Sequence, residues 1–137
     1  MGAWGNGNLE NDGTQDLIAD QSDELFSLVI KLMKSPVAAE YDEYDHDLLF
    51  FTIEKIVALA NHGLINSAPP SHKIEPLIAP FMKHWTEYHQ SAGHDIPVER
   101  KAVIEHSFVE LLVVAKNACS GSFGHRISLI SAKMNQQ

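Results

Sequence analysis

Apolar side chains recur at three- and four-residue spacing in several stretches of this chain, which is the period of an amphipathic helix. The first such stretch predicts a helix over Gly13–Lys34. Asp12 and Gln15 stand in capping-box spacing, so Asp12 is predicted to accept hydrogen bonds from the first free amides. Ser22, followed by two acidic residues, is a second N-cap signal, which leaves open a break in this helix.

A second helix is predicted to begin near Asp45 or Asp47 and to end at the stop signal Asn61-His62-Gly63. It is apolar almost all round, which indicates a central position in the domain. One stripe along it consists of Leu49, Ile53, Ile56 and Ala60, and this stripe is widened by Leu48, Phe50, Phe51, Val57 and Leu59.

The same spacing predicts a third helix from about Ile74 to Ser91 and a fourth that follows Pro97 and ends near Ser120. The apolar face of the fourth helix is expected to consist of Val103, Ile104, Phe108, Leu111, Leu112 and Ala115. The tail, Phe123 to Gln137, suits one short helix, although alternation around Ile127 also allows a strand. The pattern therefore predicts an all-α protein.

Length and composition place these elements in one domain. A chain of 137 residues with 45% hydrophobic content is large enough for a single core, so we expect a compact single-domain bundle of four to six helices. No apolar run approaches the length of a membrane span, and no signal-peptide pattern opens the chain. A single cysteine, Cys119, excludes an internal disulfide. We expect a cytoplasmic protein that does not bind membranes.

The opening of the chain places a tryptophan among glycines, in Met-Gly-Ala-Trp-Gly. Ordering a glycine-rich loop costs conformational entropy, and burial of an indole would compensate for that cost. We therefore expect residues 1–12 to form a loop packed on the core, with Trp4 as a structural plug and Asp12 as the helix cap.

This opening, together with Glu10-Asn11-Asp12 and Asp16, resembles a bacterial family of small uncharacterised proteins that begin Met-Gly-Ala-Trp-Gly. The likeness is specific over the first 16 residues, with Leu9 where an aromatic residue is commoner, and is loose beyond them. The family is a domain of unknown function, so the resemblance implies a bacterial origin and a fold class more than a chemistry. Some similar small acidic proteins are immunity partners of bacterial toxins.

Negative charge is concentrated in the first third of the chain. Residues 1–47 hold 11 acidic side chains and two lysines, a net charge of −9, whereas residues 48–137 hold seven acidic and eight basic side chains, a net charge of +1. A field of this sign repels nucleic acid and anionic membranes and attracts a basic partner. The alternative is that the charge only keeps the protein soluble.

The most acidic stretch, Glu40 to Asp47, also carries two tyrosines and contains no lysine or arginine. Aromatic residues are enriched at the centres of interfaces, and acids around them would engage Arg or Lys of a partner. The predicted partner-binding residues are Glu40, Tyr41, Asp42, Glu43, Tyr44, Asp45 and Asp47. The alternative is a solvated acidic loop.

Sequence motifs for catalysis or metal binding are weak. His84 and His89, and likewise His89 and His94, are five residues apart, a spacing that puts two residues on different faces of a helix. Glu43 and His46 form a single Glu-x-x-His pair, and the spacing predicts structural or surface histidines. We expect no metal, no cofactor and no enzyme activity, with Cys119 as a small buried hydrophobic residue.

An anionic surface with flat rings imitates the phosphates and bases of a nucleic acid. The leading hypothesis is therefore an immunity protein that neutralises a basic bacterial toxin, a nuclease of the RNase type, by covering its active cleft. One alternative is a small cytoplasmic enzyme or ligand-binding protein with a pocket beside the Trp4 loop. Another is a structural subunit of a larger assembly.

Overall fold

The computed structural model describes residues 3–34 and 43–120, and of Cys119 and Ser120 only the backbone. Within these residues four helices form the bundle: α1 (Asp12–Lys34), α2 (Glu43–Asn61), α3 (Glu75–Ser91) and α4 (Val98–Ser120), with a short 3₁₀ helix η1 (Ser71–Lys73) before α3. The described residues contain no strand, only an isolated bridge between Ala3 and Asn11. The prediction of an all-α helical bundle is confirmed. The predictions for the tail from Phe123 and for the Cys119 side chain lie outside this part of the chain.

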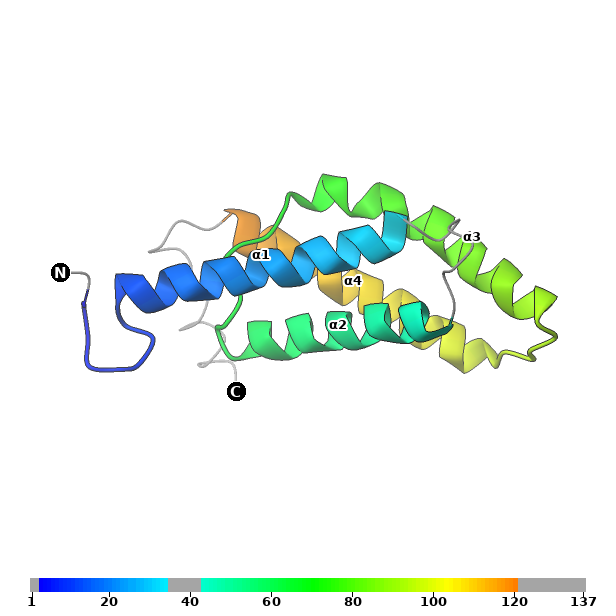
Figure 1. The fold of residues 1–137 in the computed structure, drawn as a ribbon, viewed down its shortest axis with the longest axis horizontal. Helices are drawn as coiled ribbons and strands as arrows, with labels where there is room; N and C mark the ends of the chain where they lie inside the picture. The colour runs from blue at the N-terminus through cyan, green and yellow to red at the C-terminus, as the bar shows by residue number, and fades with distance from the viewer. Residues whose placement is uncertain (1–2, 35–42, 121–137) are drawn as a thin grey trace.

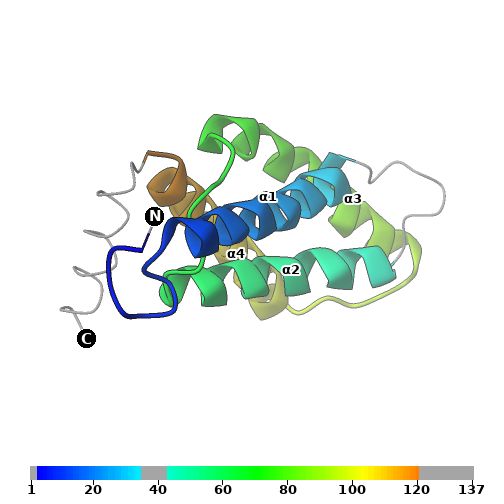
Figure 2. The same cartoon turned by 60° about the vertical axis from the view of Figure 1, so that its left-hand side comes forward.

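The helices follow one another back and forth along the bundle (Figure 1). α1 and α2 run side by side in opposite directions, and α2 also packs against α4. The loop before α1 lies at one end of the bundle, and the turn between α3 and α4 lies at the other, next to the start of α2 (Figure 2). Segments far apart in the sequence are thus brought together at that second end.

The core is formed where one apolar stripe of each helix meets the others. Its most deeply buried members include Phe26 and Val29 of α1, Ile53 of α2, and Phe81 of α3. Phe81 also packs edge-on against Phe108 of α4, with ring centroids 5.8 Å apart. Val103, expected on the buried face of α4, is instead exposed, because that face is centred on Ile104, Phe108, Leu111 and Ala115.

The start of α1 is capped one residue earlier than predicted. The side-chain oxygen of Asn11 accepts a hydrogen bond from the Thr14 amide at 2.7 Å, which is the bond of an N-cap residue. Asp12 is therefore the first helical residue, where its charge still favours the positive end of the helix dipole. The prediction that Asp12 is the cap is wrong, because Asn11 offers the same short polar side chain one position earlier.

α1 continues without a break through Ser22. The hydroxyl of this buried residue donates to the Ile18 carbonyl at 2.7 Å, within the helix. The same oxygen accepts from the Asn66 amide at 3.4 Å, and the Asn66 side chain donates to the Gln15 carbonyl at 2.8 Å. The polar residues in the middle of α1 thus bind the segment between α2 and η1. They do not break the helix.

The loop that precedes α1 lies outside the core. Trp4 is 41% exposed and the described loop residues before Glu10 are all exposed, so the prediction of a Trp4 plug is wrong. The loop is closed by its own backbone instead: the Trp4 amide donates to the Glu10 carbonyl at 3.0 Å, and the Glu10 amide donates to Gly7 at 3.1 Å. A Cβ on Gly5 would overlap the carboxylate of Glu10. Local hydrogen bonds and a small residue order this loop without burying the indole.

Among the helices that the structure describes, none is both long and apolar enough to cross a membrane.

Candidate functional site

Part of the predicted acidic surface forms the beginning of α2. Glu40, Tyr41 and Asp42 lie outside the described residues, and the helix begins at Glu43, earlier than the predicted start at Asp45 or Asp47. Carboxylates in a first helical turn are stabilised by the helix dipole, which gives the local sequence a structural reason for its acids. The residues from Glu43 to Asp47 are consequently distributed around a helix.

This distribution gives α2 an outer face on which aromatic and charged residues alternate. Tyr44, Asp47, Phe51 and Glu54 are spaced by three, four and three residues, which places them on one side of the helix. All four are exposed, Tyr44 by 72% and Phe51 by 63%. Lys55 lies beside them, with its Nζ 5.2 Å from the centroid of the Phe51 ring. We call these five residues the α2 outer face.

Phe51 is a functional candidate that the sequence analysis missed. Because α2 is apolar almost all round, its sequence predicted Phe51 as part of a widened core stripe. The buried stripe is narrower and consists of His46, Leu49, Thr52, Ile53 and Ile56. A signal was nevertheless present, since Phe51 is seven residues from Tyr44, two helical turns along the same face.

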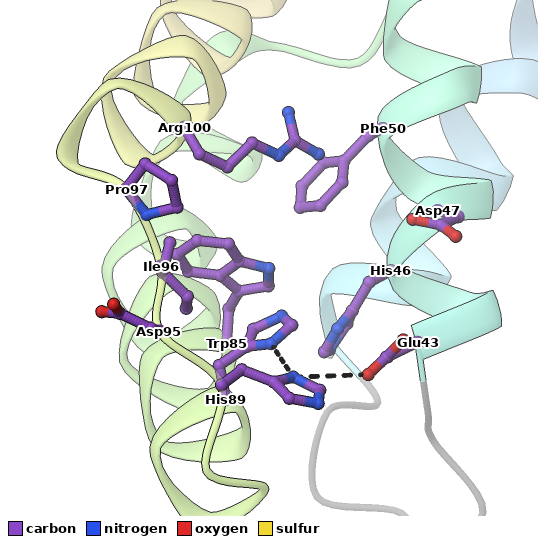
Figure 3. A pocket seen from close by; sticks show the side chains of 11 residues that line it. Glu43, His46, Asp47, Phe50, Trp85, His89, Asp95, Ile96, Pro97 and Arg100 are labelled. Atoms are coloured by element: carbon purple, nitrogen blue, oxygen red, sulfur yellow. Dashed lines mark hydrogen bonds and ion pairs between the residues drawn. The ribbon is translucent and has the colours of Figure 1, made fainter.

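Beside this face, a groove of about 260 Å³ lies between the start of α2 and the segment that joins α3 to α4 (Figure 3). Arg100 of α4 lies over the ring of Phe50, with its guanidinium carbon 5.2 Å from the ring centroid. The remaining lining is mixed and comprises Glu43, His46, Asp47, Trp85, His89, His94, Asp95, Ile96 and Pro97. The groove thus has aromatic side chains in its walls and both acidic and basic side chains at its rim.

Two histidines meet at one end of the groove. Nδ1 of His89 lies 2.8 Å from Nδ1 of His94, and the same atom of His94 lies 3.5 Å from Oε1 of Glu43. Figure 3 shows these contacts as dashed lines, with Glu43 reaching across from α2. Ligand atoms of the three residues all lie within 4.8 Å of one another.

The spacing argument against a metal site fails for this pair because His94 is not on the helix. α3 ends at Ser91, and Gly93 adopts a positive φ of 75° that reverses the chain. The His94 amide then donates to the His89 carbonyl at 2.9 Å and the Gly93 amide donates to Gln90 at 3.1 Å, the two bonds of a Schellman motif. The turn places the two side chains together, whereas a continuous helix would separate them.

His46 is a histidine of the core. It is 2% exposed, and its ring packs edge-on against Phe81, His84 and Tyr88, with centroids 5.1 to 5.8 Å apart. Burial, with smaller contributions from the charges of His84 and His89, lowers the pKa of His46 to about 4. Burial also lowers the pKa of His84 and of His89. These rings are therefore neutral at pH 7, and the predicted structural role of His46 agrees with its position.

The start of α2 and the α3–α4 turn, which line the groove, lie at the opposite end of the bundle from the loop before α1 (Figures 1 and 2), so the groove is not the pocket expected beside the Trp4 loop. Comparisons of the chain with protein families, with curated proteins and with solved structures found no match. The functional argument consequently depends on the surface and the groove themselves.

Proposed function

We propose that the protein is an immunity protein, which binds a basic bacterial toxin of the nuclease class through the α2 outer face and thereby covers the toxin's active cleft. Binding would follow from the folded surface alone, without a catalytic step in this chain. The acidic residues Glu43 and Asp45 lie in the first turn of α2 and would add to the negative field around the α2 outer face.

The observation that carries this proposal is the pair of exposed rings on α2. Tyr44 and Phe51 project from one face of a helix whose opposite side is fixed in the core. Large aromatic side chains held on a rigid element lose little conformational entropy on binding, and such residues dominate the binding energy of many interfaces. Exposed singly they would need no explanation, but here Asp47 and Glu54 lie between and beyond them on the same face.

Charge supports a basic partner. Glu43, Asp45 and Asp47 give the start of α2 a negative field, whereas the acids of α1, from Asp12 to Glu24, lie toward the other end of the bundle, and the first 47 residues carry a net charge of −9 in all. Such a field accelerates the encounter with a positively charged protein and weakens as salt rises. A nuclease cleft is basic because it receives phosphates, and its subsites for bases accept flat rings. Asp47 and Glu54 beside Tyr44 and Phe51 present these two chemistries together.

The proposal is tested with the protein encoded by the neighbouring gene. If that protein is a nuclease, RNA cleavage should fall in proportion to added inhibitor and stop at one equivalent. Asp47→Asn with Glu54→Gln should slow association and flatten its salt dependence, since rim charges act mainly on the on-rate. Glu105→Gln, an exposed acid on α4, is the matched control and should leave association unchanged. Cleavage that is unaffected by an excess of the protein would contradict the proposal.

A second candidate function, a ligand-binding protein, is supported by the groove. Arg100 stacks on Phe50 at its rim, an arrangement that would suit a small planar anion. Trp85 lines the same groove, so its fluorescence would report a bound ligand. A saturable change in emission that Arg100→Gln abolishes would favour this function over the immunity function.

A further inference from the structure

Three metal-ligating side chains from two separate parts of the chain meet at the end of the groove. Glu43 is the first residue of α2, His89 belongs to the last turn of α3, and His94 follows the turn after α3. The sequence separates Glu43 from the histidines by more than forty positions, so only the fold brings them together. Glu43 and His94 are exposed and His89 is half-buried, which leaves the cluster accessible from solvent.

The positions of the two histidines are fixed by the backbone. The helix α2 ends in the same kind of turn, where the Leu64 amide donates to Leu59 at 2.8 Å and Gly63 has a positive φ of 73°. In that turn the two residues brought together are leucines, the apolar pair that usually accompanies a Schellman motif. At the end of α3 the equivalent positions are occupied by His89 and His94. Two imidazoles therefore meet there in place of the usual apolar pair. His89 is held further by its contact with the Trp85 ring, with centroids 4.9 Å apart.

The distances suit a tetrahedral transition-metal ion. Zn–N bonds of about 2.0–2.1 Å with tetrahedral angles hold neighbouring ligand atoms roughly 3.3 Å apart. Two contacts, 2.8 Å between the histidine nitrogens and 3.5 Å between His94 and Glu43, lie on either side of that value, and the ligand atoms of His89 and Glu43 lie within 4.8 Å of one another. Small rotations of exposed side chains would therefore open the cluster around an ion.

The donor set also selects the kind of cation. Two imidazole nitrogens and one carboxylate oxygen form a common set of three protein ligands for Zn²⁺, and imidazole equally suits Ni²⁺, Cu²⁺ and Co²⁺. Mg²⁺ and Ca²⁺ prefer six or more oxygen ligands, which this cluster does not offer among its three residues.

We propose that Glu43, His89 and His94 bind one divalent transition-metal cation of the Zn²⁺ class, with solvent in the remaining coordination position. The ion would join the start of α2 to the α3–α4 turn and so tie together one end of the bundle. No residue of the cluster belongs to the α2 outer face, although Glu43 adds to the negative field there, and the affinity for Zn²⁺ is measured separately from binding to a partner. The same three contacts without an ion would be a histidine–histidine hydrogen bond and an ion pair, and the two arrangements are distinguished by experiment.

The first experiment is a calorimetric titration of the metal-stripped full chain with Zn²⁺. We expect one site per chain, and we expect Glu43→Gln and His94→Gln each to weaken it at least tenfold, the order of loss that follows removal of a metal ligand or its support. His106→Gln is the matched control. On α4, Nε2 of His106 lies 3.4 Å from Oε1 of Glu110, so His106 is also an exposed histidine beside a glutamate. This pair does not include a second histidine. This variant should bind as the wild type does.

Co²⁺ provides an independent readout of the geometry. A tetrahedral nitrogen–oxygen site gives strong visible absorption, which we expect for the wild type and His106→Gln and not for His94→Gln. Zn²⁺ should also raise the Tm of the wild type, because the ion binds the folded chain, and at the same Zn²⁺ concentration it should raise the Tm of His94→Gln less. Circular dichroism of each variant without metal establishes that it has folded.

Two results would overturn the proposal. One is a folded wild-type protein that shows no saturable binding of Zn²⁺ or Co²⁺. The other is a binding site that survives in folded Glu43→Gln and His94→Gln or is lost in His106→Gln, which would place the ion elsewhere. Because Glu43 and His94 are both exposed, neither substitution removes a core contact, and the test does not depend on altering half-buried His89.

Discussion

The buried histidine of α2 should make the stability of this protein strongly dependent on pH. His46 occupies a core position among Phe81, His84 and Tyr88, where a charged imidazole would lose its hydration. We therefore expect acidification to destabilise the wild type more than a His46→Phe variant, in which a ring of similar size replaces the imidazole. Measurements in EDTA remove any contribution of bound metal.

The sign and size of this pH dependence follow from the pKa of His46, which is lowered from 6.5 to about 4 by folding. Between these values the unfolded chain binds a proton that the folded protein does not, so stability rises with pH across this window and is lost as pH falls. Each pKa unit corresponds to about 1.4 kcal/mol, so the difference amounts to roughly 3 kcal/mol between pH 7 and pH 4.

Urea denaturation at intervals from pH 7.5 to pH 4 would measure this difference. The loss of unfolding free energy in the wild type should exceed that in His46→Phe by about 3 kcal/mol, with the divergence beginning near pH 6.5. His62→Gln removes an exposed histidine at the end of α2 and should follow the wild type. Parallel curves for the wild type and His46→Phe would refute the assignment of a buried neutral imidazole at this position.

Three further predictions concern stability and can be measured by thermal or chemical denaturation. Asn11→Ala should lower the free energy of unfolding by about 1 kcal/mol, because it removes the cap of α1. Asp12→Ala should lower it by only a few tenths of a kcal/mol, the contribution of its charge at the helix dipole. A larger loss for Asp12→Ala than for Asn11→Ala would show that Asp12 is the cap. Phe108→Ala should cost about 3–5 kcal/mol, because its buried ring packs against Phe81, and a cost below about 1 kcal/mol would contradict the core described. Trp4→Ala should cost about 1 kcal/mol, the average for point substitutions, and a cost equal to that of Phe108→Ala would show that the indole is a structural anchor.

The helical pattern predicted the fold because it depends on local periodicity. Ile53 in α2 and Phe108 in α4 are buried as the spacing of their stripes indicated, whereas Val103, at the edge of the α4 stripe, is exposed. The starts of helices were less certain, since Asn11 and Asp12 are both good caps and only the hydrogen bond to Thr14 distinguishes them. The exposed residues of α2 were harder still to predict, because the sequence of a helix with apolar residues on most sides does not indicate that Phe51 faces solvent.

The candidate site could be predicted only in part. The acids and the tyrosine at the start of α2 were visible as a charged stretch, and Glu43, Tyr44 and Asp47 are exposed there. The histidine cluster could not be found from helical spacing, because Gly93 reverses the chain and returns His94 to His89. Its third member, Glu43, comes from a distant segment that packing places alongside. Trp4 was misplaced because backbone hydrogen bonds, which leave no sequence signature, order its loop.

The most direct test of the proposed interface is the affinity of the neighbouring gene's product for the double variant Tyr44→Ala, Phe51→Ala. If the two rings anchor the complex, the loss should be at least about 30-fold, since one interface anchor contributes about 2 kcal/mol. Leu17→Ala on α1 is the matched control, because Leu17 is 61% exposed and lies outside the α2 outer face, and it should bind as the wild type does. A folded double variant that retains the wild-type affinity, or an equal loss in Leu17→Ala, would contradict binding through the α2 outer face.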